Sequence, residues 1–187
     1  MNKVKFGLSN VHIAPLTYDG TKYTYDEIIK IPGAVSLSLE PSGDSNDFYA
    51  DNVIYFSSTA NQGYEGDLEI AMITDEIREK IFGELKDKNG AFIESAKDIN
   101  TPFAFGFQIE GDEKGRRFWY YNCTMSRPGN SASTTEATKE PSTDTLTMKA
   151  MPRITDSRVR IFLTETAENK EAYDSFFDTV YEEVTET

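Results

Sequence analysis

The residue types that most often perform catalysis or bind metal ions are scarce in this sequence. His12 is the only histidine and lies between Val11 and Ile13 in an expected strand, a position typical of a residue in or beside the core. Cys123 is the only cysteine, which excludes an internal disulfide and a cysteine-based metal cluster. Because Cys123 lies in an aromatic strand, we interpret it as a small buried residue rather than a nucleophile. Since P-loop, GxSxG and GxGxxG motifs are also missing, the sequence predicts no catalytic residue, metal site or cofactor.

Carboxylates are the abundant reactive groups. The chain has 32 Asp and Glu residues against 19 Lys and Arg residues, which gives a net charge of −13. A pair such as Asp44 and Asp47 can bind a cation or act in acid–base catalysis, but such pairs arise by chance at this abundance. The span between Lys30 and Arg78 has no basic residue and contains Glu40, Asp44, Asp47, Asp51, Glu65, Asp67, Glu69, Asp75 and Glu76. Such a surface either is merely solvated, which aids solubility, or repels a passing polyanion.

The small number of basic residues argues against a DNA-binding surface. A protein that binds duplex DNA needs clusters of Lys and Arg to displace counterions, and this sequence has none. The aromatic run FWYY at 118–121 has the residue types that stack on bases, but only Arg116 and Arg117 accompany it. Successive side chains of a strand point to opposite faces, so this run favours sheet packing on both sides.

Length and composition predict one globular domain rich in strands. The 187 residues suffice for a buried core, and the aromatic content of 12% favours strands. No run approaches 18 apolar residues, so no segment is expected to span a membrane. The first residues, MNKVK, have no apolar stretch behind their lysines, so we expect no secretion signal and a reducing cytoplasm as the simplest compartment.

Alternation of apolar and polar residues predicts most of the strands. It occurs at 35–40, 67–73 and 101–110, and the turn GDEKG at 111–115 returns the chain into 116–125 as a long aromatic hairpin. Further strands are expected at 52–57, 91–93, 143–151 and 158–164. Many strands with few helices between them predict an antiparallel β-sandwich or barrel.

A short helix is expected at 75–82, beside the sheet. Thr74 is suited to cap it and Gly83 to end it. Ile77 and Ile81 give it one apolar stripe that covers a face or an edge of the sheet.

A second helix is expected at the C-terminus, at 167–184. Helical spacing places on one face Ala172, Tyr173, Phe176, Phe177, Val180, Tyr181 and Val184. This stripe packs on its own subunit or, alternatively, docks on a neighbouring subunit as an arm.

Polar segments at 41–51, 57–66 and 127–143 predict long loops. They are rich in Ser, Thr, Asn, Asp, Gly and Pro, with few apolar residues. Structureless loops of this length are uncommon in a compact domain and tend to be functional or mobile.

Several short segments occur in a characteristic order along nearly the whole chain. They are IPGAV at 31–35, ADNVIYF at 50–56, NQGYEGDLE at 61–69, FG at 82–83, FAFGF at 103–107, RR at 116–117, YYN at 120–122, TLTM at 145–148 and AYDSFF at 172–177. Together they make the sequence similar to the major tail protein, or tail tube protein, family of long-tailed, non-contractile (siphovirus-type) phages of Gram-positive bacteria.

The resemblance implies a domain organisation. Residues 1–164 would form the tail tube β-sandwich, with an inserted extension at 41–66, a long loop or hairpin that reaches neighbouring subunits, and 165–187 an acidic, helical C-terminal arm. The extension residues are Pro41, Asp44, Asp47, Val53, Ile54, Tyr55, Phe56, Gly63 and Gly66. The apolar run 53–56 would pair with an exposed edge of a neighbour.

The resemblance also implies a function. Such proteins are structural subunits of the virion tail, are assembled in the host cytoplasm, and form stacked hexameric rings through which DNA is ejected, without enzymatic activity. Their partners would be further copies of the chain, the tape measure protein, the tail terminator and distal tail proteins. A lumen lined by carboxylates would let DNA slide without binding, and the candidates are Asp44, Asp47, Asp51, Glu65, Asp67 and Glu69. The alternative function is a monomeric β-sandwich binding module, adhesin-like or carbohydrate-binding, whose aromatic residues form a ligand face.

Overall fold

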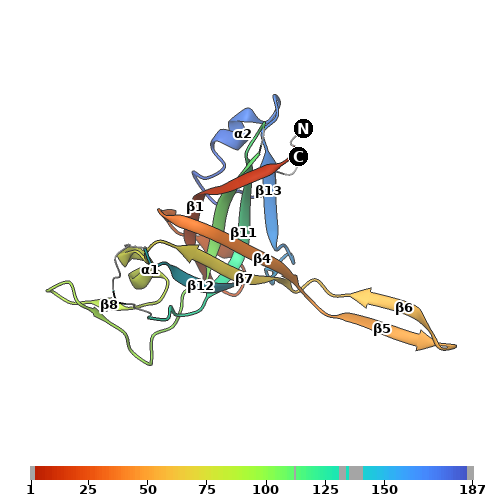
Figure 1. Ribbon diagram of the computed structural model, residues 1–187, viewed down its shortest axis with the longest axis horizontal. Coiled ribbons are helices and arrows are strands. Elements are labelled where there is room, and N and C mark those ends of the chain that lie inside the picture. The colour runs from red at the N-terminus through yellow and green to blue at the C-terminus, as the bar shows by residue number, and fades with distance from the viewer. Residues whose placement is uncertain (1–2, 112, 131–133, 135–140, 185–187) are drawn as a thin grey trace.

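The computed structural model describes residues 3–111, 113–130, 134 and 141–184, which form antiparallel strands and two short helices (Figure 1). The elements are β1 (Lys5–Tyr18), β2 (Tyr23–Tyr25), β3 (Ile29–Lys30), β4 (Ala34–Ser42), β5 (Ser45–Ala50), β6 (Val53–Thr59), β7 (Gly63–Ile70), α1 (Asp75–Lys80), β8 (Leu85–Lys86), β9 (Phe92–Ile93), β10 (Phe103–Gly111), β11 (Arg116–Met125), β12 (Asp144–Ala150), β13 (Arg160–Thr164) and α2 (Lys170–Asp174). The predicted mainly-β, sandwich-type fold is confirmed, and the sheets are not closed into a barrel.

One nine-stranded sheet forms the body of the molecule. Its order is β2-β1-β10-β11-β12-β7-β4, with β3 also paired to β1 and β13 to β11. Along one edge of β11, residues 116–120 pair with β13 and residues 123–125 pair with β12. The sheet therefore divides at β11, and its two parts enclose the main core.

The main core lies between these two parts and under α1. It is built from fully buried side chains, among them Ile13, Leu68, Ile70, Phe103, Phe105, Leu146 and Met148. Ile77 of α1 and Ile81, the C-cap residue of this helix, are fully buried in the same core, as their spacing predicted. Gly83 has a φ of +73°, which suits its predicted place after the helix.

The predicted cap of α1 is absent. Thr74 occupies the N-cap position, but its hydroxyl makes no capping hydrogen bond and is buried without a hydrogen-bond partner among the described residues. The entry to the helix is fixed one residue earlier, where the Ile73 backbone N–H donates to Asp144 Oδ2 of β12 at 3.0 Å. An attachment to the sheet thus takes the place of a local cap.

A second core lies on the opposite face of β11. Trp119 and Tyr121 are buried there with Phe176 and Val180 of the C-terminal segment. The indole N–H of Trp119 donates to the carbonyl oxygen of Phe176 at 2.8 Å, and the Tyr121 hydroxyl donates to the carbonyl oxygen of Tyr181 at 3.0 Å. The alternation predicted for the run at 118–121 is therefore confirmed, with its neighbours Phe118 and Tyr120 in the main core.

The C-terminal helix is shorter than predicted. Only Lys170–Asp174 is helical, and turns follow as far as Val180. Side chains of β11 explain this, since Arg117 donates to the carbonyl of Tyr173 while Trp119 and Tyr121 take the two carbonyls named above. The predicted apolar residues still face the body, but they lie on an irregular segment whose carbonyls accept hydrogen bonds from side chains of β11.

Two segments predicted as loops form strands. Residues 41–51 and 57–66 pair along most of their length, as β4 continues into β5 and β6 into β7. Their polar composition reflects a ribbon with neither face in the core, so the hydrophobic alternation of a half-buried strand is missing. Much of the third predicted loop, 127–143, lies outside the described residues, as do Asp112 of the turn GDEKG and the last three residues, 185–187.

The buried contact between Phe176 and β11 generates a stability prediction. Phe176→Ala should lower the free energy of unfolding by about 3 kcal/mol, because a fully buried aromatic side chain is replaced by a cavity. Urea unfolding can be followed by the emission of Trp119, the only tryptophan. The control Val184→Ala, at a side chain that is 79% exposed, should change stability by less than about 0.5 kcal/mol. Equal effects of the two substitutions would contradict the packing described here.

Candidate functional site

The β5–β6 hairpin projects from the body as a two-stranded ribbon (Figure 1). Its tip is a two-residue turn in which Asp51 and Asn52 have φ values of +53° and +63°, the pattern of a type I′ turn. At its base, a Cβ on Gly43 would lie 1.8 Å from the carbonyl oxygen of Ala60, so only glycine fits there. The chain therefore specifies both the tip of the hairpin and its departure from the body.

The hairpin exposes large apolar side chains to solvent. Six of them, each 54–74% exposed, are Phe48, Tyr49, Val53, Ile54, Tyr55 and Phe56. An apolar surface of this kind, carried on an arm and rimmed by polar residues, is typical of a protein-interaction site. Burying one such side chain completely is worth about 1.5–3 kcal/mol, so contact with another protein would stabilise the hairpin strongly.

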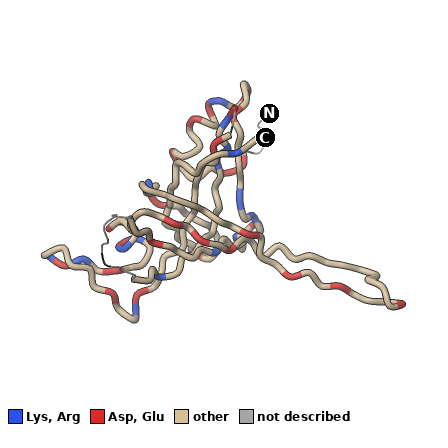
Figure 2. Tube along the Cα trace, in the orientation of Figure 1, with Lys and Arg blue, Asp and Glu red and all other residues tan. Residues whose placement is uncertain are grey.

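The charge on the hairpin has one sign. Figure 2 shows acidic residues along it and no basic residue. These acids are Asp44 near the base, Asp47 in β5 and Asp51 at the tip. The Ser57 hydroxyl of β6 donates to Asp47 Oδ1 at 2.6 Å, which fixes this carboxylate across the ribbon. The hairpin is thus both apolar and acidic.

The other candidate acids lie on the body, along the exposed side of β7. Glu65, Asp67 and Glu69 alternate with buried or half-buried residues. Their registered neighbours on β4 and β12 are polar: Ser36, Ser38, Glu40, Thr145, Thr147 and Lys149. Pro41 and Gly66 lie where this surface meets the ribbon, and a Cβ on Gly66 would lie 1.8 Å from the Ser38 carbonyl oxygen. The six predicted acids therefore form two groups, three on the hairpin and three on β7.

Hydroxyl groups hold the β7 carboxylates in place. Glu69 accepts hydrogen bonds from Thr143 (2.6 Å) and Ser36 (2.8 Å), and Asp67 accepts one from Thr147 (2.8 Å). The bonds from Thr143 and Ser36 lower the pKa of Glu69, so this carboxylate keeps its negative charge. Glu65 forms an ion pair with Lys149, at 3.1 Å between Oε1 and Nζ. The result is an ordered acidic surface.

The predicted C-terminal arm packs on its own subunit. Tyr173, Phe176 and Val180 are buried, and Phe177 and Tyr181 pack against the second core. This packing covers Trp119 and Tyr121, so the aromatic run at 118–121 is not available as a ligand face. His12 stacks on Phe177 at 4.7 Å between ring centroids, consistent with its predicted place beside the core.

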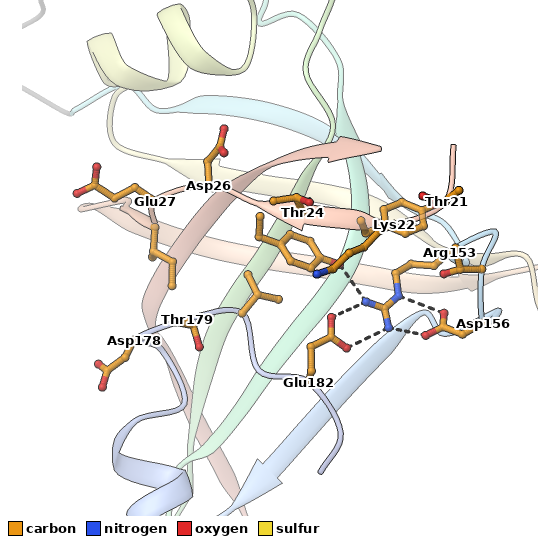
Figure 3. A pocket seen from close by; sticks show the side chains of 15 residues that line it. Thr21, Lys22, Thr24, Asp26, Glu27, Arg153, Asp156, Asp178, Thr179 and Glu182 are labelled. Atoms are coloured by element: carbon orange, nitrogen blue, oxygen red, sulfur yellow. Dashed lines mark hydrogen bonds and ion pairs between the residues drawn. The ribbon is translucent and has the colours of Figure 1, made fainter. Parts of the chain in front are cut away.

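Sequence reasoning missed Arg153, which binds the end of the C-terminal segment. Arg153 is 6% exposed and lies between Glu182 and Asp156, with the nearest N···O distance 2.5 Å to each carboxylate (Figure 3). Burial opposes its charge, but hydrogen bonds to Glu182 and Asp156 outweigh burial and raise its pKa. The guanidinium also lies 4.2 Å from the ring centroid of Tyr121. An arginine among acidic residues gives no distinguishing signal in the sequence.

These surfaces are suited to association with other molecules. Cys123 is fully buried, and burial raises the pKa of its thiol, in agreement with its interpretation as a core residue. Within the described ranges, no group of three or more His, Cys, Asp or Glu residues is placed to hold a metal ion. None of the helices described is long and apolar enough to cross a membrane.

A β-domain that extends an apolar hairpin into solvent has the architecture expected of a structural protein that assembles with other chains. The comparison with protein families agrees, because the family model described as phage tail tube protein matches residues 38–186. The chain therefore belongs to the phage tail tube protein family, whose members are structural proteins of the virion tail that self-assemble into a tube with other tail proteins. No curated protein matches the chain.

The exposed hairpin generates a second prediction. The double substitution Tyr55→Ser and Phe56→Ser should weaken self-association while changing the free energy of unfolding by less than about 1 kcal/mol, because both side chains are exposed. Sedimentation velocity and urea unfolding measure the two quantities. The control Leu146→Ala, in the main core, should instead lower stability by about 2–5 kcal/mol. A large stability loss in the double variant would show that the hairpin packs on its own subunit.

Proposed function

We propose that this chain is the major subunit of a long, non-contractile phage tail tube, in which six copies close into a ring and rings stack into the conduit for DNA ejection. The observation that carries the proposal is the β5–β6 hairpin, with its six exposed apolar side chains and family membership behind it. A contact between the hairpin of one copy and the body of the next joins two different surfaces, and such contacts close into rings or continue into tubes.

The acidic side of β7 is the proposed lining of the lumen. Glu65, Asp67 and Glu69 form a row of carboxylates flanked by hydroxyl groups, which offers a passing DNA phosphate no cationic partner. The nearest basic residue on that surface, Lys149, is paired with Glu65. DNA would then slide along a surface that repels it rather than bind. The hairpin acids Asp44, Asp47 and Asp51 remain candidates for the same surface in the assembled ring.

The remaining parts of the proposal follow from this role. Residues 1–164 act as the tube domain, with the extension 41–66 as the contact between subunits, and 165–187 as the acidic C-terminal arm, of which the described residues pack against that domain. The tube would assemble in the bacterial cytoplasm around a tape measure protein, between a tail terminator and distal tail proteins. The subunit has a structural role and needs no cofactor.

Removing the hairpin should separate assembly from folding. Ser42 and Gly63 both belong to the large sheet, and the Ala60 backbone N–H donates to the Asp44 carbonyl at 3.0 Å. Replacing 45–59 by Asn-Gly therefore closes the ribbon with a tight turn at its base. We expect a folded body, judged by circular dichroism and the emission of Trp119, and no rings or tubes in negative-stain microscopy.

A matched control keeps the length of the hairpin. Replacing only the tip, Asp51-Asn52, by Asn-Gly should leave tube formation intact, since both pairs suit the same turn. Tubes formed by the shortened chain would contradict the proposed role of the hairpin. An unfolded shortened chain would show that the hairpin belongs to the core.

The proposed lumen can be tested by reversing its charge. Tubes carrying Asp67→Lys and Glu69→Lys should retain a short DNA duplex, and the retention should fall steeply as salt is raised. The control Asp26→Lys and Glu27→Lys makes the same charge change at exposed positions elsewhere on the body. DNA retention in a filtration assay should be high for the first variant and low for the control. Equal retention by both would contradict the placement of β7 in the lumen.

A further inference from the structure

A groove at one end of the body is lined by basic residues, which the hairpin lacks. It has a volume of about 440 Å³ and lies between residues 3–5, the end of β10 and the start of β11. Its lining includes Lys3, Val4, Lys5, Ile109, Glu110 and Arg116. On a chain with a net charge of −13, a surface with three basic residues against one acidic residue is unusual.

The acidic member of this groove is already engaged within the body. Glu110 Oε1 accepts hydrogen bonds from the Ser9 hydroxyl at 2.5 Å and from Gln108 Nε2 at 2.8 Å. Both donors are neutral, so the carboxylate keeps its charge but is held against its own sheet, and the three basic side chains outnumber it in the groove. An acidic partner is favoured there.

Exposed apolar side chains lie on the strands that form the groove. Val4, which lines the groove, is 52% exposed, and Phe162, the strand partner of the lining residue Phe118, is 49% exposed. Phe6, which follows Lys5 on β1, is 65% exposed. The guanidinium of Arg116 lies 5.1 Å from the ring centroid of Phe162, so a cation and an aromatic ring form one surface. Among the described residues, 5–9 of β1 pair only with β10, which leaves one edge of this segment open to another strand.

From these features we infer that the groove receives the β5–β6 hairpin of a second copy of the chain. The hairpin brings Asp44, Asp47 and Asp51 together with six exposed apolar side chains, so the two surfaces are complementary in charge and in apolar character. The hairpin points away from the body, and the groove lies near the N-terminal end of the chain, so the contact joins two molecules (Figure 1). The inference rests on the self-assembly proposed above and names its receiving surface.

The segment 84–100 is the strongest competing surface. It also exposes apolar side chains, among them Leu85, Ile93 and Ile99. Its charges, however, are mixed, and some are paired: Lys86 with Asp75 at 2.7 Å and Glu94 with Arg127 at 2.5 Å. We therefore expect the acidic hairpin to bind this surface less strongly than the basic groove.

Photo-crosslinking distinguishes the two surfaces. Tyr55, which is 74% exposed near the tip of the hairpin, is replaced by p-benzoylphenylalanine, and full-length tubes are irradiated and digested. We expect crosslinked peptides from 3–6, 109–118 or 162. Crosslinks confined to 84–100 or to β7 would overturn the inference while leaving tube formation in place. If the unmodified chain forms no oligomer at any concentration, the proposed function itself fails.

Charge reversal in the groove gives a second, independent measurement. The variant Lys5→Glu with Arg116→Glu should raise the protein concentration needed for assembly by about tenfold, because it places like charges opposite the hairpin. Lys97→Glu and Lys88→Glu make the same change within the competing segment and should leave that concentration unchanged. The emission of Trp119 reports whether each variant is folded. A folded groove variant that assembles like the unmodified chain, or a larger effect of the control, would overturn the inference.

Discussion

Strand β11 is the element on which the other parts of the molecule depend. Its aromatic rings alternate between two cores, so Phe118 and Tyr120 fill the space between the two parts of the sheet while Trp119 and Tyr121 bind the C-terminal segment. The same strand pairs with β10 on one edge and with β13 and then β12 on the other. Close packing is part of this arrangement, since a Cβ on Gly106 would lie 2.8 Å from the Trp119 ring. Because interiors tolerate little change of volume, the positions of the strands that pair with β11 depend on its side chains.

The conformation of the hairpin depends on the body of the molecule. A two-stranded ribbon with neither face buried is only marginally stable alone, so its conformation is set by the strands β4 and β7 that continue into it. Its apolar side chains would favour uncontrolled association, and its acids, with the net charge of −13, oppose that association by repulsion. A partner surface that is both basic and apolar neutralises the acidic charge of the ribbon and buries its apolar side chains. The ribbon can therefore be soluble when free and still bind such a partner.

The sequence predicted the elements that bury at least one face, and it failed where both faces are solvated or where side chains from distant strands override helical periodicity. Alternation predicted β4, β7 and β10 because each of these strands has a core side, and the aromatic run at 118–121 predicted a β11 that packs on both faces. Ile77 and Ile81 marked the helix α1 by their spacing. Composition alone predicted polar loops around a short strand for the hairpin, because a solvated ribbon shows no alternation, and only the family resemblance implied a long loop or hairpin there. The C-terminal helix was predicted too long because periodicity cannot reveal that β11 side chains take its carbonyls. Arg153 was missed because its partners, Glu182 and Asp156, meet it only in the folded chain.

The way the C-terminal segment is held bears on which surfaces remain for assembly. Its last residues are attached by ion pairs, Arg153 with Glu182 and Arg158 with Glu183, the second of which is solvent-exposed and therefore weak. Its aromatic residues, by contrast, are buried on β11, and this burial outweighs the ion pairs. Aromatic side chains committed to their own subunit are not available to a neighbour. The association energy of the tube must therefore come chiefly from side chains that the folded body leaves exposed, and the hairpin carries the largest described group of these on one element.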